Sequence, residues 1–385
     1  MGLRQSTVEG VVTDVTDRAL FGGVYEGRRV FVTGHTGFKG SWLTFWLLSL
    51  GAHVTGYSLE PPTEPALFDK LGLADRIDHN IGDIRDLKHL QGVMIAAQPE
   101  IVFHLAAQPL VRLSYDEPVE TFEVNVMGSV NVLEAARKTH GVSAVVNVTS
   151  DKCYENREWE FAYRENDPLG GYDPYSASKG AVEIVTAAYR QSFFADESVA
   201  AVATGRAGNV IGGGDWALDR IVPDCIRALA ACEPIAVRNP DAVRPWQHVL
   251  EPTSAYLWLA SRLFTGGHDY EGSWNFGPLS GGNLTVREVV ERVIGEWGSG
   301  EWVGPAAGSV SVHEARFLKL DCAKAADVLG WHPTWTAADA LRETTSWYRR
   351  LHEGEPAEKL TAECLSAYVA TAREARVPWG DCRDV

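Results

Sequence analysis

The sequence has few cysteines and no long apolar run, and each absence excludes a class of protein. Its six cysteines are scattered over 385 residues, and no two have the Cys-x-x-Cys spacing. This argues against a structural zinc site and against a disulfide framework, so we expect no metal centre. No apolar run reaches the roughly 18 residues of a membrane span, and the N-terminus lacks the apolar region of a signal peptide. We therefore expect no membrane partner and a cytoplasmic location.

Basic residues are also in short supply. The chain has 35 Lys and Arg against 51 Asp and Glu, which gives a formal charge of -16 at pH 7. A surface of that sign repels the phosphates of nucleic acids and anionic lipids, so we expect no nucleic-acid partner. An anionic substrate would have to meet a local cluster of cations.

Short apolar runs alternate with helical segments in the first half of the chain. We expect strands at 29–33, 53–57, 101–105, 144–148 and 199–203, and helices at 41–50, 124–138 and 175–194. This alternation is typical of a doubly wound parallel sheet, and it predicts an α/β protein with a Rossmann-like domain over residues 27–207. Residues 208–350 predict mainly a smaller substrate-binding lobe, with some segments returning to the Rossmann domain. Residues 1–26 and 351–385 are an N-terminal extension and a C-terminal tail of no predicted role.

Three glycines lie at the junction between the first expected strand and the first expected helix. Gly34, Gly37 and Gly40 give the pattern Gly-x-x-Gly-x-x-Gly. Glycines are needed there because the backbone must turn sharply and approach a pyrophosphate at the helix N-terminus. The pattern in this position predicts a dinucleotide site. No Lys or Arg directly follows the second strand to hold a 2′-phosphate, which favours NAD over NADP.

Two side chains of the glycine loop are unusually bulky. His35 and Lys39 stand where small residues are common, and either would crowd the cofactor and weaken its binding. Lys39 contacts a phosphate in one interpretation and points to solvent in the other. The residues leave both open.

A Tyr-x-x-x-Lys pair follows about 140 residues later. Asp173 suits a helix N-cap and Pro174 the first helical position, so Tyr175 and Lys179 fall one turn apart on one face. An ammonium beside a phenol lowers its pKa from about 10, so that the phenolate takes a hydroxyl proton as hydride leaves. The alternative is an exposed helical pair.

A second polar group directly follows the strand at 144–148. Ser150, Asp151 and Lys152 provide a hydroxyl, a carboxylate and an amine at the end of a strand, where such folds place their chemistry. They are a potential hydrogen-bond donor, acid and base. The alternative is a solvated polar turn.

Together these motifs carry a family resemblance. The chain resembles the extended short-chain dehydrogenase/reductase family of NAD-dependent epimerases and dehydratases, and within it the branch of CDP-glucose 4,6-dehydratases. The matching blocks are GHTGFKGSWL (34–43), HLAAQPLVRLSY (104–115), TSDKCY (149–154), GGYDPYSASKG (170–180), RAGNVIGGGDW (206–216), RPWQHVLE (244–251), WNFGP (274–278) and LKLDC with LGWHP (318–322 and 329–333).

The resemblance implies a tightly held NAD and a nucleotide sugar, CDP-glucose, as substrate. Tyr175 would deprotonate the C4 hydroxyl, and Ser150 would orient the C4 oxygen. Water would then leave across C5 and C6, with Asp151 as the acid and Lys152 as the base. Related dTDP-glucose dehydratases carry an Asp-Glu pair at these two positions, so the lysine supports the CDP branch. The product would be a 4-keto-6-deoxy sugar.

The resemblance also implies binding residues and an assembly. The implied cofactor residues are Gly34, His35, Thr36, Gly37, Phe38, Lys39, Ser58, Asp83, Ile84, Leu105, Ala106, Ala107, Asn125, Thr149, Tyr175 and Lys179. The implied substrate residues are Arg112, Asn209, Arg220, Arg244 and His248. Members commonly form homodimers through two helices per subunit, here 124–138 and 175–194. A sugar-nucleotide 4-epimerase, which needs no eliminating acid and base, and a non-catalytic NAD-binding regulator remain the alternatives.

Overall fold

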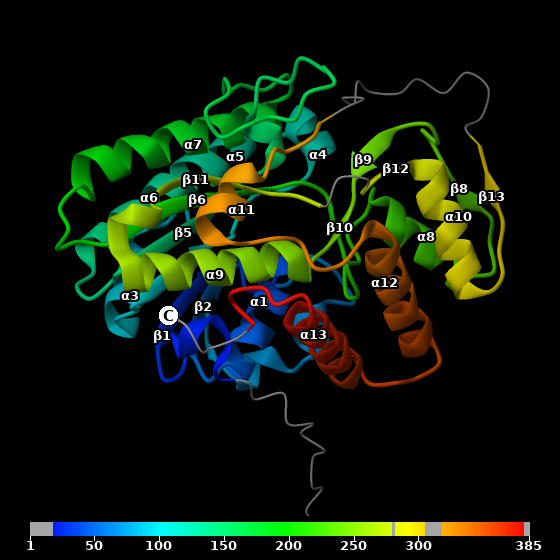
Figure 1. The fold of residues 1–385 in the computed structure, drawn as a ribbon, viewed down its shortest axis with the longest axis horizontal. Coiled ribbons are helices and arrows are strands. Elements are labelled where there is room, and N and C mark those ends of the chain that lie inside the picture. Colours follow the sequence, from blue (N-terminus) through cyan, green and yellow to red (C-terminus); the bar gives the residue numbers. More distant parts are fainter. Residues whose placement is uncertain (1–17, 279–281, 305–317, 381–385) are drawn as a thin grey trace, which may run out of the picture.

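A parallel sheet of seven strands forms the centre of this computed structural model, which describes residues 18–278, 282–304 and 318–380 (Figure 1). In sheet order the strands are β11 (Gly272–Phe276), β6 (Ala201–Ala207), β5 (Ala144–Val148), β4 (Ile101–His104), β1 (Arg29–Thr33), β2 (His53–Ser58) and β3 (Asp78–Ile81). The chain runs outward from β1 to β3 and then returns to the other side of β1 with β4. The gap between β1 and β4 is therefore the switch point at which such sheets bind ligands. The predicted α/β class and doubly wound sheet are confirmed.

Strand boundaries follow the predictions closely where both faces of the strand are buried. The strands β1 and β5 have the predicted bounds, whereas β6 begins two residues later than expected and runs on to Ala207. The strands β3 and β11 were not predicted. β3 reads Asp-His-Asn-Ile and has no buried residue, because it is the edge of the sheet. Its pairing with β2 is visible only in the folded chain.

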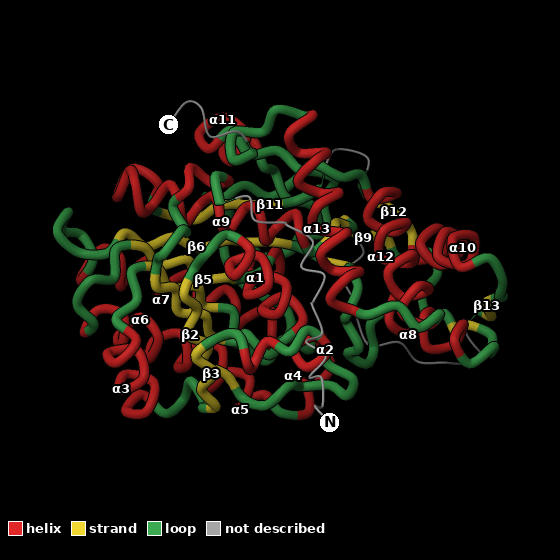
Figure 2. The backbone as a smooth tube through the Cα atoms, turned by 90° about the horizontal axis from the view of Figure 1, so that it is seen from below, coloured by secondary structure: helices red, strands yellow, loops and turns green. Residues whose placement is uncertain are grey.

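Apolar side chains alternate between two cores, one on each face of the sheet. Phe31 and Val145 point to the face covered by α3 (Leu87–Ala97), α6 (Gly128–Lys138) and α7 (Pro174–Phe193). Val30 and Val146 point to the face covered by α1 (Phe38–Ser49) and α9 (Leu250–Gly266). Figure 2 shows the strands between these helices. Burial on both faces explains why these strands are continuous apolar runs.

Several further helices and turns are short. They are α2 (Leu67–Lys70), α4 (Val111–Asp116), α5 (Pro118–Phe122), α11 (Ala323–Leu329), a π-helical turn at Glu123–Met127, and 3-10 turns at Leu20–Gly23, Leu73–Asp75, Asp151–Cys153 and Gly267–Tyr270. The helix expected at 124–138 is therefore partly wrong, because its first turn is π-helical and α6 begins at Gly128.

A smaller lobe lies beside the carboxyl ends of the strands (Figure 1). It contains α8 (Ile221–Ala230), α10 (Val286–Trp297), α12 (Ala337–His352) and three strand pairs, β7 (Val210–Ile211) with β10 (Gln247–His248), β9 (Val243–Pro245) with β12 (Asn283–Thr285), and β8 (Ile235–Ala236) with β13 (Trp302–Val303). Among the described residues, none of the helices has the length and apolarity to span a bilayer.

The two ends of the described chain pack against each other. The ring of Phe21 stacks on that of Trp379 at a centroid distance of 5.1 Å, and Trp46 of α1 lies edge-on to both. The C-terminal helix α13 (Ala357–Glu374) buries Tyr368 against this group. The described parts of the two terminal segments thus cover α1, the helix that follows the glycine loop. The remainder, residues 1–17 and 381–385, lies outside the described residues.

Glu251 on α9 joins α13 to the core, and we expect it to make stability depend on pH. Its buried carboxyl accepts hydrogen bonds from the backbone nitrogens of Thr334 at 2.9 Å and Trp335 at 2.6 Å, and from the Tyr368 hydroxyl at 2.8 Å. Burial raises its pKa from 4.5 to about 7, and these hydrogen bonds only partly oppose the shift. The folded protein therefore binds this proton more tightly than the unfolded chain. The resulting stabilisation is complete below the unfolded pKa and is lost as pH rises through about 7.

The variant Glu251→Gln tests this dependence. Between about pH 5 and pH 7 we expect the free energy of unfolding of the wild type to fall by on the order of 1 kcal/mol per pH unit more than that of the variant. Urea denaturation at several pH values measures both slopes. Equal slopes would show that Glu251 does not titrate in this range.

Candidate active site

The glycine loop presses against the segment that follows β4. Gly34 has a φ of +76°, and a Cβ there would lie 2.6 Å from the backbone nitrogen of Ala106. A Cβ on Gly40 would lie 2.1 Å from the carbonyl oxygen of Gly34. Because only glycines fit, backbone N–H groups and the N-terminus of α1 meet at the switch point. This is the cradle that a dinucleotide pyrophosphate needs. Leu105 borders the loop with Ala106, and Ala107 follows them.

We expect Gly40→Ala to damage this cradle. The added methyl would collide with the Gly34 carbonyl, so the loop must shift, at a cost of about 1–3 kcal/mol in stability. Affinity for NAD should fall by about tenfold or more, equivalent to about 1.4 kcal/mol. Calorimetric titration and thermal unfolding measure the two effects. The control is Gly92→Ala on α3, where a Cβ meets nothing within 4 Å; it should keep cofactor affinity and raise stability slightly. Equal affinity in both variants would contradict the assigned role.

The ribose end of the predicted site lies at the end of β2. Thr36 Oγ1 is 2.8 Å from Ser58 Oγ, so two hydroxyls stand there in place of a carboxylate. The Asp83 carboxylate accepts a hydrogen bond from Arg85 at 2.6 Å, which lowers its pKa. Ile84 is a core residue and is only 4% exposed. The contact of Asp83 and Ile84 with adenine stays a prediction.

Neither bulky loop side chain points to solvent. His35 is fully buried, with Nε2 2.7 Å from His79 Nδ1, and burial lowers its pKa to about 3. Lys39 Nζ lies 5.5 Å from the centre of the Tyr256 ring. The pKa of Lys39 is lowered to about 8 mainly by burial, with the charges of Lys179 and Arg220 acting in the same direction and that of Asp151 in the opposite one. The interpretation of Lys39 as a solvent-exposed side chain is therefore wrong. Phe38, the first residue of α1, packs toward the lobe at Gly212.

The Tyr-x-x-x-Lys pair lies on the first turns of α7, with both side chains buried. Asp173 caps this helix by accepting a hydrogen bond from the Ser176 backbone nitrogen at 2.9 Å, and Pro174 is its first residue. The predicted helix start is confirmed, and the alternative of an exposed pair is wrong.

The pKa of Tyr175 does not follow the prediction. Burial raises it to about 12, although a hydrogen bond with Ser150 and the charge of Arg220 act in the opposite direction. Burial also lowers the pKa of Lys179 to about 8, which the charge of Glu183 partly opposes. The expectation that the ammonium beside Tyr175 lowers its pKa below the ordinary value is therefore wrong. The physical reason is that both groups have lost their hydration.

The serine hydroxyl after β5 is hydrogen-bonded to both of the residues that follow it. Ser150 Oγ donates to Asp151 Oδ1 at 3.0 Å and accepts from the Lys152 backbone nitrogen at 3.2 Å. Asp151 is 4% exposed, and burial raises the pKa of its carboxyl against the opposing charge of Lys152. A carboxyl that keeps its proton to higher pH is suited to act as an acid. The alternative of a solvated turn is wrong for Asp151, whereas Lys152 is half-buried.

Sequence reasoning missed a buried ion pair behind this group. Glu183, one turn beyond Lys179, lies 2.7 Å from Arg206 at the end of β6, and both are almost fully buried. Glu183 also accepts a hydrogen bond from the Thr149 hydroxyl at 2.5 Å, which fixes the position of the threonine side chain. The spacing of Tyr175, Lys179 and Glu183 at intervals of four was the signal that could have found it.

Asn125 supports the site from the π-helical turn. Its Nδ2 donates to Ser178 Oγ at 2.9 Å and to the Gln108 carbonyl at 3.1 Å, and its Oδ1 accepts from the Gln108 backbone nitrogen at 2.8 Å. It ties the segment after β4 to α7. The expectation that Asn125 supports the site agrees with these hydrogen bonds, and its contact with the cofactor stays a prediction.

Three of the five predicted substrate residues lie near this centre. Arg220 pairs with Asp215 at 2.8 Å, and its charge acts on Tyr175. The charge of Arg244 acts on Asp151. Asn209 is half-buried in the segment between β6 and β7.

The other two differ from these three in their burial. Arg112 is exposed and forms a 3.5 Å ion pair with Asp219 of the lobe. His248 is fully buried between the rings of Trp42 and Trp335, at 5.8 and 5.0 Å, and burial lowers its pKa to about 3. Both of its ring nitrogens already contact the protein, because Nδ1 accepts a hydrogen bond from the Leu250 backbone nitrogen at 3.3 Å and Nε2 lies 3.9 Å from Cys364 Sγ. Its assignment as a substrate contact is therefore wrong. Within the described ranges, no group of three His, Cys, Asp or Glu could hold a metal.

Comparisons with known proteins agree with this geometry. A CDP-glucose 4,6-dehydratase from Salmonella typhimurium is 49% identical over 355 residues, which cover 91% of this chain and 98% of that protein. A UDP-glucose 4-epimerase from Mycolicibacterium smegmatis is 28% identical over 83% of this chain and 98% of its own length. A dTDP-glucose 4,6-dehydratase from Streptomyces venezuelae, solved with NAD bound, superposes with a TM-score of 0.68 at 25% identity, covering 84% of this chain and 97% of that one.

The model of one family, described as GDP-mannose 4,6 dehydratase, matches residues 31–344, which is most of the chain. The resemblance predicted from the motifs is confirmed. With the dinucleotide cradle at the switch point and a buried tyrosine, serine and aspartate beside it, the chain belongs to the GDP-mannose 4,6 dehydratase family of NAD-dependent epimerases and dehydratases.

Proposed function

We propose that this protein is an NAD-dependent hydro-lyase that converts CDP-glucose to CDP-4-keto-6-deoxyglucose. The observation that carries the proposal is the meeting of Tyr175 with the Ser150–Lys152 group at the end of β5. Apart from the hydride acceptor, an oxidation at C4 needs only the tyrosine as a base. Loss of water needs a further acid and a further base from the protein. The 49% identity to a CDP-glucose 4,6-dehydratase supports the substrate.

Each side chain has one task in this reaction. Tyr175 takes the proton of the C4 hydroxyl, and Ser150 orients that oxygen through its hydrogen bond with the tyrosine. When bound, NAD supplies the acceptor and donor for the hydride that moves from C4 to C6. Asp151 gives its proton to the C6 oxygen while Lys152 takes the C5 proton. The C6–O bond breaks, the electron pair of C5–H forms the C5–C6 double bond, and water leaves. Lys152 then returns its proton to C5 as the hydride reaches C6, which gives the 4-keto-6-deoxy sugar.

The cofactor and the nucleotide would bind on opposite sides of this centre. We propose that the cradle of Gly34, Gly37 and Thr36 holds the cofactor phosphates, with Ser58 at the ribose and Thr149 and Lys179 at the nicotinamide end. The substrate diphosphate would lie by Arg220 and Arg244, whose planar guanidinium groups suit phosphate oxygens in an otherwise acidic protein. Asn209 would assist them. The exposed Arg112 would reach the substrate only by exchanging Asp219 for a phosphate.

We also propose a homodimer formed through α5, the π-helical turn, α6 and α7. Large apolar side chains are exposed there, including Val119 at 70%, Ile184 at 60% and Met127 at 52%. A second copy of this face would cover them. Light scattering should give twice the chain mass, and Ile184→Glu should reduce it to one chain with unchanged circular dichroism. A monomeric wild type would refute the dimer.

Domain organisation and location are proposals as well. We propose a Rossmann domain over 27–207 and a substrate lobe formed mainly by 208–350, because the glycine loop and the arginines that we assign to substrate divide in this way. A cytoplasmic location would place the protein with NAD and nucleotide sugars.

The decisive experiment is incubation with CDP-, dTDP-, UDP- and GDP-hexoses, followed by detection of 4-keto-6-deoxy product. We expect CDP-glucose to be preferred and deuterium at C4 to reappear at C6. A C4 epimer as the product would instead identify an epimerase. Cofactor binding without turnover of any hexose would identify a regulator.

A further inference from the structure

Tyr256 on α9 has a fully buried side chain whose hydroxyl has no hydrogen-bond partner among the described residues. Buried hydroxyls are nearly always paired, because an unpaired one loses its hydration without compensation. Neighbouring tyrosines follow this rule. Tyr25 donates to the Leu257 carbonyl at 2.6 Å, and Tyr368 donates to Glu251 at 2.8 Å. The exception at Tyr256 therefore needs an explanation.

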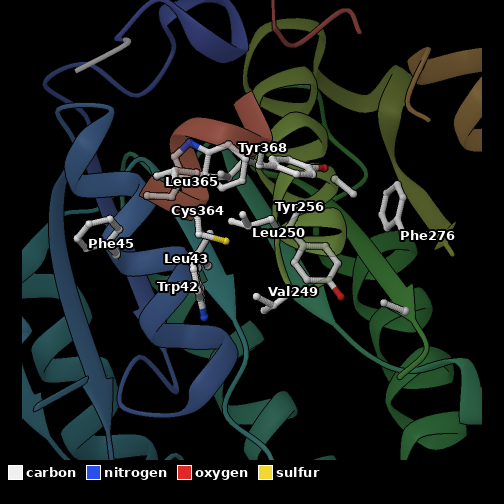
Figure 3. Close-up of a cluster of buried hydrophobic side chains, with 14 of the residues drawn as sticks. Trp42, Leu43, Phe45, Val249, Leu250, Tyr256, Phe276, Cys364, Leu365 and Tyr368 are labelled. Atoms are coloured by element: carbon white, nitrogen blue, oxygen red, sulfur yellow. The ribbon is translucent and has the colours of Figure 1, made fainter. Parts of the chain in front are cut away.

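The ring of Tyr256 packs against β6, near the carboxyl end of that strand. A Cβ on Gly205 of β6 would be 2.7 Å from the ring, so the ring occupies the space that a side chain would fill. Phe276 closes the other side, with ring centroids 6.0 Å apart. Figure 3 shows Tyr256 and Phe276 in this cluster of buried side chains. The ring is thus held in one place.

This place is adjacent to the strand that carries the reactive residues. Gly205 pairs with Val148 of β5, and its carbonyl accepts from the Thr149 backbone nitrogen at 3.0 Å. Ser150 and Asp151 follow directly in sequence.

A lysine amine lies near the ring of Tyr256, and two further groups act on the pKa of its hydroxyl. Lys39 Nζ lies 5.5 Å from the ring centre. Burial raises the pKa of Tyr256 above its ordinary range, and the charges of Asp151 and Tyr175 raise it further. The hydroxyl therefore keeps its proton and can act only as a neutral hydrogen-bond donor or acceptor.

We propose that Tyr256 is a further residue of the active site, whose hydroxyl donates a hydrogen bond to the oxygen that leaves C6. The inference rests on the proposed dehydration. As the C6–O bond breaks, negative charge develops on that oxygen. Asp151 delivers the proton that makes it water, while Tyr256 keeps its own proton and stabilises the charge in a dry site. The substrate oxygen then accepts the hydrogen bond for which the Tyr256 hydroxyl has no partner among the described residues.

Tyr256→Phe removes this hydroxyl and keeps the ring under Lys39. With CDP-glucose we expect turnover to fall by about a hundredfold, as for other lost donors to developing charge. With the analogue that carries fluorine in place of the C6 hydroxyl, the variant should lose turnover by a comparable factor, because departing fluoride needs no proton from Asp151 but still develops negative charge that the hydroxyl stabilises. The melting temperature should stay the same or rise, since an unpaired buried group is removed.

The matched control is Tyr25→Phe. It removes a hydroxyl that donates a hydrogen bond to the carbonyl of Leu257, the residue after Tyr256 on α9. This variant should lower the melting temperature and leave turnover on the two substrates, and therefore its ratio, unchanged. Wild-type turnover by Tyr256→Phe on CDP-glucose would overturn the inference. Failure to form the 4-keto hexose, which arises before the leaving group departs, would also overturn it, because the hydroxyl would then not act on the leaving group. A loss on CDP-glucose with unchanged turnover of the fluoro analogue would overturn it too, because the hydroxyl would then deliver the proton. A wild type that releases neither water nor fluoride would overturn the proposed function and this inference with it.

Discussion

Tyr175→Phe is expected to lower turnover by about 10²–10⁴-fold, the range typical for loss of a positioned general base. The ring would remain on the first turn of α7, where Asp173 and Pro174 set the helix start. Only the oxygen that takes the C4 proton would be lost. Because every later step needs the C4 ketone, neither ketone nor water should form.

The measurement is a quench with borodeuteride, which traps any 4-keto hexose as a deuterium-labelled hexose that mass spectrometry detects. Tyr175→Phe should trap none. The control is Tyr189→Phe on the same helix, whose ring packs edge-on to Phe193 far from the site. It should behave as wild type. A Tyr175→Phe protein within tenfold of wild type would assign the proton transfer to another group.

Lys152→Ala should block a later step and leave the first one intact. The amine is half-buried directly after the Ser150–Asp151 pair and is the proposed base for the C5 proton. Product formation should fall by about 10²-fold or more. The 4-keto hexose should still form and be trapped at about one equivalent per active site in the same quench. The contrast with Tyr175→Phe separates oxidation from elimination.

Lys152→Arg is the matched control for charge. Guanidinium keeps the positive charge but does not release its proton at usable pH, so it should stall elimination as alanine does. If arginine restored turnover, Lys152 would act through its charge alone. Loss of trapped ketone in Lys152→Ala would place the lysine at the oxidation step instead.

The sequence alone was enough for those parts that depend on neighbouring residues. Gly34, Gly37 and Gly40 identify the loop. Gly34 needs glycine for its φ of +76°, and a Cβ on Gly40 would meet the Gly34 carbonyl, so both requirements are local. The spacing of Tyr175 and Lys179 follows from helix geometry, and Asp173 and Pro174 mark where that helix begins. Apolar runs such as 144–148 predict buried strands, and the order of strands and helices predicts the doubly wound sheet.

Tertiary structure decided whatever depends on burial among distant segments. The ring of Tyr256 packs against β6 because Gly205, 51 residues earlier, leaves room for it. His248 is excluded from the substrate because Trp42 and Trp335 enclose it. The pKa of Tyr175 rises where its spacing from lysine predicted a fall. Loss of hydration and contacts between residues far apart in the chain leave no mark in local sequence, so only the folded protein reveals them.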